Sequence, residues 1–335
     1  METRKLQKTG GSTYIVSLPK HWVTGSKLKE GDPVSMVIDD NGLLVLDHTL
    51  GSSRPSSRIE VFVDDDANSV HFLRSLIGLY ISGYDEIIVR SKTRIPPEIR
   101  KAVRDFTRKV IGPEIVEESG IAITIQDVAD HSHLDMRKIL RRMHLMARSM
   151  HVDAIESMAE GNKGLAGDVV SRDDEVDRLY WFMAKQRSMM ARDSTVARKI
   201  GVSLTEASFF VAASKALERI ADHAARIAYS ASDLAGEKIP EKVVSEIQAY
   251  SEAVLAVLDK AVEALLKRDS RIANEVADEA EKLREKRNSV IRQVMEQRGK
   301  FAVPLALVVE SLERTALYSA DLAETAINIG GPEKK

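Results

Sequence analysis

Two pairs of carboxylate residues in the second half of the chain have a spacing that could bind metal ions. Asp173 and Asp177 lie four residues apart in one predicted helix, and Glu218 and Asp222 lie four apart in a later one. Side chains at positions i and i+4 share one face of a helix. If the two faces meet, four carboxylates converge, and they cannot all stay ionised without protons or cations between them. Such a site would either take protons or recruit hard to borderline metal ions: Fe, Mn, Mg, Ca or Zn.

The same spacing is also typical of a solvated helix surface with ordinary ion pairs. Four arginines stand close to the carboxylates in the sequence: Arg172, Arg178, Arg219 and Arg226. Exposed ion pairs stabilise a protein by only about 0–1 kcal/mol. Spacing alone leaves both the metal site and the ion-paired surface open.

Long helices must position these carboxylates. Apolar residues recur at helical spacing in six segments that glycine or proline residues interrupt. The predicted helices cover residues 134–161, 165–192, 203–234, 241–267, 271–298 and 303–329. The two halves of this region match at several points, for example Leu217-Glu218-Arg219 with Leu312-Glu313-Arg314. We therefore expect two three-helix bundles in tandem, over about 134–235 and 241–330.

The first 130 residues predict two smaller domains. Residues 1–50 contain short strands, including a hairpin whose turn holds Asn41-Gly42. Segment 51–57 is a linker by composition. Strands and helices alternate over 58–130, which predicts a small α/β domain with helices on one face of a mixed sheet. The fold class is thus multidomain and mainly α, with an N-terminal β unit, an α/β middle domain and helical bundles over 133–330.

Composition excludes several classes of protein. Hydrophobic residues make up 44% and charged residues 30%, which is incompatible with a disordered chain, and a net charge of −2 excludes a protein that is basic throughout. The absence of cysteine excludes disulfides, thiolate catalysis and Fe–S clusters. No apolar run follows the charged N-terminus or is long enough to span a membrane. We expect a cytoplasmic protein without a signal peptide or membrane insertion.

Catalytic motifs are also missing from the sequence. A ferritin-type di-metal oxidase needs Glu-x-x-His pairs within its bundle, and the nearest spacing, Asp130-x-x-His133, falls at the domain junction. No nucleophile and base stand in a catalytic arrangement. The chain is therefore predicted not to be an enzyme.

The helical region resembles the PhoU family of phosphate-signalling regulators. The resemblance rests on LERIADHAARIA, on SRDDEVDRLYW in the preceding helix and on the tandem repeat, and covers about 134–330. PhoU-type bundles carry (E/D)xxxD motifs that bind multinuclear metal clusters, often iron or zinc. The resemblance implies that Asp173, Asp177, Glu218 and Asp222 are metal ligands. It also implies a phosphate transporter ATPase or another phosphate-signalling protein as the partner.

The second repeat departs from this pattern. At the offset of 107 residues that relates Ala154-Ile155-Glu156 to Ala261-Val262-Glu263, the first carboxylate pair falls on Ala280 and Arg284, although a shift of one residue gives Glu281 and Glu285. In the third helix Glu313 remains, but its partner position is Leu317. We expect one good metal site rather than two.

The first fifty residues resemble the AbrB/SpoVT/MazE swapped-hairpin family. RKLQKTGGSTYIVSLPKHWV and LKEGDPVSMVIDDNGLLVL carry this resemblance. It implies that two chains exchange hairpins into one small barrel and that basic residues near the first strand reach DNA. A fifty-residue unit buries little surface alone, which also favours a homodimer or a higher oligomer. The candidate DNA contacts are Arg4, Lys5, Lys8, Lys20 and His21, whose chemistry suits phosphate, with Arg also able to read guanine.

The alternative for this unit is dimerisation without DNA binding. It holds six Lys and Arg against six Asp and Glu, so it is not a basic domain. Three of its basic residues nevertheless fall within Arg4–Lys8, which can form a local positive patch.

Together these features predict a cytoplasmic regulator of phosphate uptake or homeostasis. Metal-binding bundles would be coupled to a DNA-binding domain, with a transcriptional or transporter-directed role. The alternative is a dimeric adaptor that does not bind DNA and that binds a phosphate transporter ATPase or another signalling protein.

Overall fold

The computed structural model describes residues 2–38, 42–48, 57–131, 134–296 and 300–330. The chain forms two compact units, Met1–Ser56 and Ser57–Lys335. The expected turn at Asn41-Gly42, the linker at 51–57 and His133 fall wholly or mostly outside the described residues.

The N-terminal unit consists of two antiparallel hairpins and one short helix. Strand β1 (Gln7–Thr9) pairs with β2 (Thr13–Ile15), and β3 (Ser35–Ile38) pairs with β4 (Leu44–Asp47). Helix α1 (Lys20–Gly25) begins directly after Pro19. The two hairpins agree with the short strands expected in residues 1–50.

None of the described side chains in this unit is buried. Large apolar residues are instead more than 60% exposed, namely Leu6, Tyr14, Met36, Ile38 and Leu43. Exposing this much apolar surface is unfavourable for an isolated domain, because burying it would stabilise the fold by about 25 cal/mol per Å².

The second unit begins with a four-stranded mixed sheet in the order β5-β6-β8-β7. β5 (Arg58–Phe62) and β6 (Glu86–Arg90) are parallel, whereas β7 (Pro113–Glu118) and β8 (Ala122–Asp127) join by antiparallel pairing. Alternate residues of β6 and β8 share one core with α2 (Ser69–Ile81) and α3 (Pro97–Lys109). Both helices therefore cover the same face of the sheet, as predicted.

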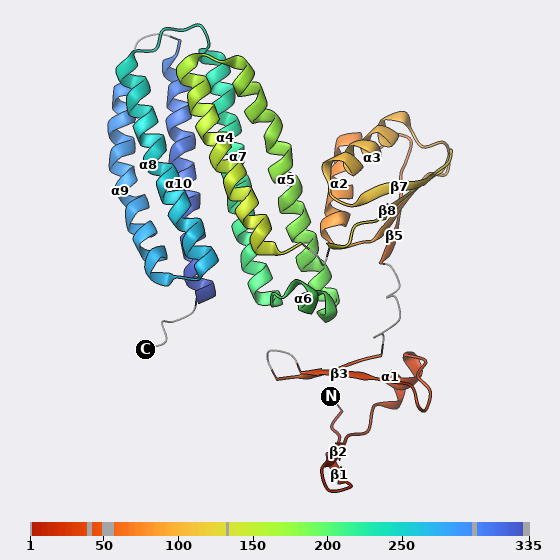
Figure 1. The fold of residues 1–335 in the computed structure, drawn as a ribbon. Helices are drawn as coiled ribbons and strands as arrows, with labels where there is room; N and C mark the ends of the chain where they lie inside the picture. The colour runs from red at the N-terminus through yellow and green to blue at the C-terminus, as the bar shows by residue number, and fades with distance from the viewer. Residues whose placement is uncertain (1, 39–41, 49–56, 132–133, 297–299, 331–335) are drawn as a thin grey trace. The chain divides into compact units, whose positions relative to one another are not determined.

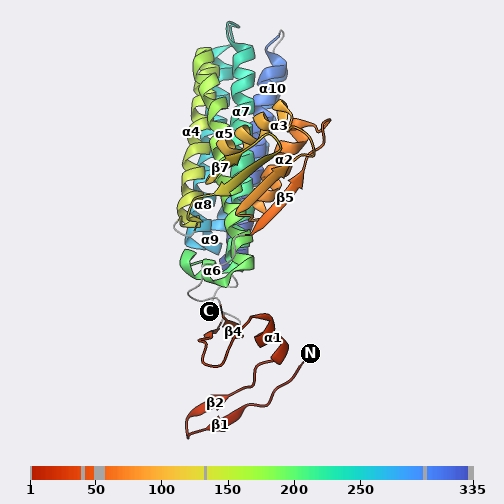
Figure 2. The same ribbon diagram turned by 90° about the vertical axis from the view of Figure 1, so that its right-hand side faces the viewer.

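Six long helices complete the second unit and lie side by side, with α8, α9 and α10 beside α4, α5 and α7 (Figures 1 and 2). They share one hydrophobic core across both repeats. The bounds are α4 Met136–Glu160, α5 Lys163–Arg192, α7 Leu204–Leu234, α8 Glu241–Lys267, α9 Ser270–Met295 and α10 Ala302–Gly330. The prediction of a mainly helical chain ending in helical bundles is confirmed. None of the described helices is apolar over a stretch that would cross a membrane.

Local signals in the sequence set the ends of these helices. Gly161 has a left-handed backbone (φ 67°) and ends α4, and the Asn162 side chain accepts a hydrogen bond from the Leu165 amide at 3.1 Å at the start of α5. The sequence does not predict the short helix α6 (Ser194–Ile200). It is only seven residues long, so it offers little periodicity to recognise.

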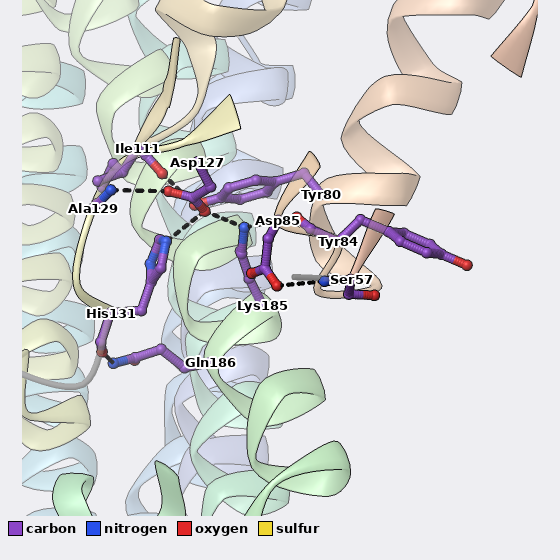
Figure 3. A network of polar contacts seen from close by, with 10 residues as sticks. All are labelled: Ser57, Tyr80, Tyr84, Asp85, Ile111, Asp127, Ala129, His131, Lys185 and Gln186. Carbon is purple, nitrogen blue, oxygen red and sulfur yellow. Dashed lines mark hydrogen bonds and ion pairs between the residues drawn. The ribbon is translucent and has the colours of Figure 1, made fainter. Parts of the chain in front are cut away.

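A buried polar network fastens the α/β part to α5 (Figure 3). The Lys185 ammonium is fully buried, donates to the Asp127 carboxylate and to the Tyr84 carbonyl, and lies 4.5 Å from the centre of the Tyr80 ring. The same Asp127 oxygen contacts His131 Nε2 at 2.5 Å. Burial would raise the pKa of Asp127, but His131 and Lys185 outweigh it and hold that pKa below its ordinary value.

Removing the cation of this network should destabilise the protein strongly. Lys185→Met leaves a buried carboxylate without its counterion, and breaking such a pair costs about 3–5 kcal/mol. We expect this loss in the free energy of unfolding measured with urea. Adding Asp127→Asn to Lys185→Met should recover part of it, because the stranded charge is removed. Arg187→Met, at an exposed site on the same helix, should change stability little. If Lys185→Met and Arg187→Met lowered the free energy of unfolding equally, a stabilising role for the network would be contradicted.

Candidate functional site

The structure brings the two carboxylate pairs together at the seam between α5 and α7. Asp173 and Asp177 lie on α5, and Glu218 and Asp222 lie on α7. The two helices pack against each other, helped by buried small residues of α7 such as Ala221. We call these four residues the carboxylate cluster. Its Glu218 is 7% exposed, and the other three are half-buried.

Burial and neighbouring negative charges raise the pKa values of the three aspartates of the carboxylate cluster. Burial, followed by the negative charges of Glu218, Asp173 and Asp222, raises the pKa of Asp177 to about 7. Burial together with Asp222 and Glu218 raises the pKa of Asp173 to about 6. The pKa of Asp222 is also raised, by burial and by Glu218. These carboxylates would therefore be stabilised by a proton or a cation.

Two oxygens of the carboxylate cluster are buried without a hydrogen-bond partner. They are Oδ1 of Asp173 and Oε2 of Glu218. Such atoms have lost their hydration without compensation, which is unfavourable unless a ligand supplies it. The other Glu218 oxygen pairs with Lys215 Nζ, which also lies 4.7 Å from the centre of the Tyr180 ring.

The four arginines do not neutralise the carboxylate cluster. Arg172 pairs with Asp153 at 2.5 Å and with Asp168 at 3.0 Å. Arg219 lies over the Tyr318 ring. Within the described part of the chain, neither Arg178 nor Arg226 forms an ion pair within 4.0 Å. Among these described residues the four carboxylates thus form no ion pair with the four arginines, and it is Lys215 that brings a positive charge close to Glu218.

The cluster is a loose rather than a preformed cation site. Among the described residues, no three carboxylate or imidazole groups lie close enough to hold a metal ion as they stand. A cation would have to draw the carboxylates together and displace Lys215 from Glu218. The available donor atoms nevertheless fit a metal ion, since they are carboxylate oxygens and two of them are buried and unpartnered.

The second repeat shows no comparable meeting of carboxylate pairs on facing helices among the described residues. Glu313 of α10 pairs with Arg287 of α9 at 3.0 Å. Glu281 and Glu285 line an open surface pocket formed by α9 alone, with Lys282 and Arg284 beside them. The expectation of one good metal site rather than two stays a prediction.

The candidate DNA contacts are all exposed, but the structure does not join them into one site. Arg4 and Lys5 precede β1, Lys8 lies on it, and Lys20 and His21 lie on α1. Arg4 pairs with Glu2 at 2.8 Å. In the described residues of this unit, no hydrogen bond or ion pair connects the β1 group with the α1 group.

Sequence reasoning missed the contribution of Lys215. The sequence could have indicated this contact, because Lys215 lies three residues before Glu218 on the same helix. Side chains at positions i and i+3 of a helix are neighbours. It also missed the Asp127–His131–Lys185 network, whose members come from distant segments that gave no shared pattern.

Removing one charge from the carboxylate cluster should stabilise the metal-free protein. Because the pKa of Asp177 is raised to about 7 from 3.8, the folded state binds its proton more tightly than the unfolded state does. Stability should therefore increase as the pH falls through 7 and 6, and decrease as it rises again. Asp177→Asn should raise the melting temperature at pH 7 to 8 and flatten this pH dependence.

Asp174→Asn is the matched control, since Asp174 is exposed on the same helix and pairs with Lys109 at 2.5 Å. It should leave the melting temperature almost unchanged or slightly lower. A metal-free Asp177→Asn protein that melts below the wild type would show that the carboxylate is a stabilising partner instead of a repelled one.

Comparisons with known proteins match both ends of the chain. The PhoU domain matches residues 140–231 and 247–326, and "Antidote-toxin recognition MazE, bacterial antitoxin" matches 7–58. The phosphate-specific transport system accessory protein PhoU homolog 1 of Thermotoga maritima is 29% identical over 219 residues, which are 60% of this chain and 90% of that protein.

Solved structures show the same helical fold. PhoU from Pseudomonas aeruginosa superposes with a TM-score of 0.52 at 21% identity, covering 58% of this chain and 94% of that one. The phosphate transport system regulatory protein PhoU from Streptococcus pneumoniae gives 0.50 at 16% identity, with 59% and 94% covered. Since the two PhoU-domain matches also span more than half of the sequence, the chain belongs to the PhoU family.

Proposed function

We propose that this protein is a cytoplasmic, non-enzymatic regulator of phosphate transport, with a metal-binding helical part and an N-terminal part that dimerises and binds DNA. The relatives it resembles are named as accessory or regulatory proteins of phosphate transport. The proposed protein partner is accordingly a component of such a transporter, for example its ATPase, or another phosphate-signalling protein.

The carboxylate cluster supports the metal proposal most directly. Asp173, Asp177, Glu218 and Asp222 would hold one or more cations, with Fe, Zn, Mn, Mg and Ca as the candidates. The raised pKa values and the two unpartnered buried oxygens mark a region short of positive charge. A bound cation would supply that charge and link α5 to α7, so metal occupancy would stiffen the first repeat.

Metal should stabilise the wild type in proportion to occupancy, because a ligand that binds only the folded state raises its stability. We expect Mn²⁺ or Fe²⁺ to raise the melting temperature of resin-treated protein, with elemental analysis giving the bound amount. Glu218→Gln combined with Asp222→Asn should abolish the shift. The control Glu281→Gln, on α9, should retain it. An equal metal response in both variants would place the cation outside the carboxylate cluster and refute the proposal.

The N-terminal unit supports dimerisation through its exposed apolar side chains. Its two hairpins leave Leu6, Tyr14 and Ile38 exposed, and a second copy could bury them. Its match to a MazE antitoxin model agrees with such an exchange. Arg4, Lys5 and Lys8 follow one another along the segment that leads into and along β1, so the dimer would present two basic strips to DNA.

DNA binding is tested on the full-length protein with a short random-sequence duplex at low salt. Lys5→Ala with Lys8→Ala should weaken binding. The slope of log affinity against log salt should also fall by about 0.9 for each phosphate that a lysine no longer neutralises. The matched control is Lys27→Asn with Lys29→Ala, which removes the same charge from the same unit. Asn suits position 27, since Lys27 has a left-handed backbone with φ 55°.

The second candidate function is a dimeric adaptor without DNA binding. It is favoured by the balanced charge of residues 1–50 and by the Arg4–Glu2 ion pair, which occupies one candidate DNA contact. A wild type that is dimeric by light scattering and does not bind DNA at low salt would support this adaptor. If the Lys5→Ala, Lys8→Ala variant and the Lys27→Asn, Lys29→Ala control lost DNA binding equally, the assigned DNA surface would be contradicted.

A further inference from the structure

A second polar site lies on α7, at its seam with α10. A pocket of about 400 Å³ is lined by Arg219, Asp222, His223 and Arg226 of α7 and by Glu310, Arg314 and Tyr318 of α10. Its volume falls within the range of small-molecule sites, about 300–1,000 Å³. We call it the arginine pocket. Of its lining residues, only Asp222 also belongs to the carboxylate cluster.

The three guanidinium groups of this pocket have no acidic partner of their own. In the described chain, none of Arg219, Arg226 and Arg314 donates a hydrogen bond or forms an ion pair within 4.0 Å. Two carboxylates line the same pocket, but neither approaches to ion-pair distance. Each guanidinium therefore keeps its five N–H donors available to a ligand.

Two aromatic rings line the pocket, the buried His223 and the half-buried Tyr318. His223 is 7% exposed, its Nδ1 atom is buried without a hydrogen-bond partner, and its ring centre lies 5.9 Å from that of Tyr318. The Tyr318 ring also has the Arg219 guanidinium 5.6 Å from its centre. An unpartnered buried imidazole nitrogen, like the unpaired arginines, indicates a site built for a polar ligand.

The internal repeat explains why these groups meet. When Leu217-Glu218-Arg219 is aligned with Leu312-Glu313-Arg314, Arg219 corresponds to Arg314 and His223 corresponds to Tyr318. Arg219 lies over Tyr318, and the charge of Arg314 acts on His223 in turn. The pocket is thus a paired arrangement of equivalent positions from the two repeats, and it exists only when α7 and α10 pack together.

We propose that the arginine pocket binds a phosphate-type oxyanion. A guanidinium presents its N–H groups as a planar fork that fits two oxygens of such an anion, and three forks can surround a tetrahedral one. Tyr318 and His223 add neutral hydrogen-bonding groups. The carboxylates of Asp222 and Glu310 limit the positive charge, which favours a small anion over a long polyanion. The source is inorganic phosphate or the phosphoryl group of a small metabolite.

The arginine pocket shares Asp222 with the carboxylate cluster, but its other lining residues do not belong to that cluster, so the proposal is tested apart from metal. It can be tested by calorimetry on full-length protein freed of metal on a chelating resin. Inorganic phosphate and AMP are the two probes, and acetate at equal ionic strength is the ionic control. Binding of inorganic phosphate would identify the free ion as sufficient, whereas binding of AMP alone would identify a phosphorylated metabolite. Binding of neither probe would overturn the proposal.

Substitutions in the arginine pocket should change the affinity for the probe in directions that a merely structural role of these residues would not produce. Arg314→Ala should weaken binding of the probe by about tenfold or more, because a charge-assisted hydrogen-bonding partner is removed. Arg314→Lys should recover only part of the affinity, since it keeps the charge but not the fork. Glu310→Gln should tighten binding, because it removes a negative charge that faces the anion.

Arg141→Ala is the matched control, because Arg141 lies in another basic surface pocket, on α4. It should bind the probe as the wild type does. Equal affinities of Arg314→Ala and the wild type would overturn the proposal, as would weaker binding in Glu310→Gln. The metal response of Arg314→Ala should match that of the wild type, which keeps failure of this site distinct from failure of the metal proposal.

Discussion

The close packing of α7 against α4, α5 and α10 is the constraint on which the rest of the helical unit depends. α7 is rich in buried alanines, among them Ala213, Ala221, Ala224, Ala228 and Ala231. Alanine loses no side-chain freedom on burial, and its small size brings neighbouring helices near. Polar residues of α7 lie at two of these contacts: Glu218 and Asp222 at the seam with α5, and Arg219, His223 and Arg226 in the pocket at the seam with α10.

The two seams have opposite electrostatic character. Toward α5, Glu218 and Asp222 meet a second carboxylate pair, and burial together with the neighbouring negative charges raises the pKa values of Asp173, Asp177 and Asp222. Toward α10, the arginines of the two repeats face one another without acidic partners. The meeting of carboxylates is unfavourable in the absence of a proton or a cation, and the large shared core makes it tolerable. Strain of this kind is expected where a protein keeps binding sites at the expense of stability.

Much of the helical fold and of the carboxylate cluster could be predicted from the sequence. The helices have strong periodicity, and side chains at positions i and i+4 share one helix face, which placed each carboxylate pair on a single face. The rest depends on contacts between distant segments. Lys185 meets Asp127 only after the α/β part docks on α5, and Arg219 meets Tyr318 only when the repeats pair. Helix α6 is too short to carry a pattern. The exchange of N-terminal hairpins remains a prediction, since it requires a second chain.

The central claim is that the four carboxylates at the seam between α5 and α7 bind a metal ion. Anomalous diffraction from crystals of the full-length protein grown with Mn²⁺ tests it most directly. The account predicts anomalous density between Asp173, Asp177, Glu218 and Asp222, with the Lys215 ammonium displaced from Glu218. Density confined to other surfaces, such as the acidic face of α9 around Glu281 and Glu285, with the Lys215–Glu218 pair intact, would contradict it.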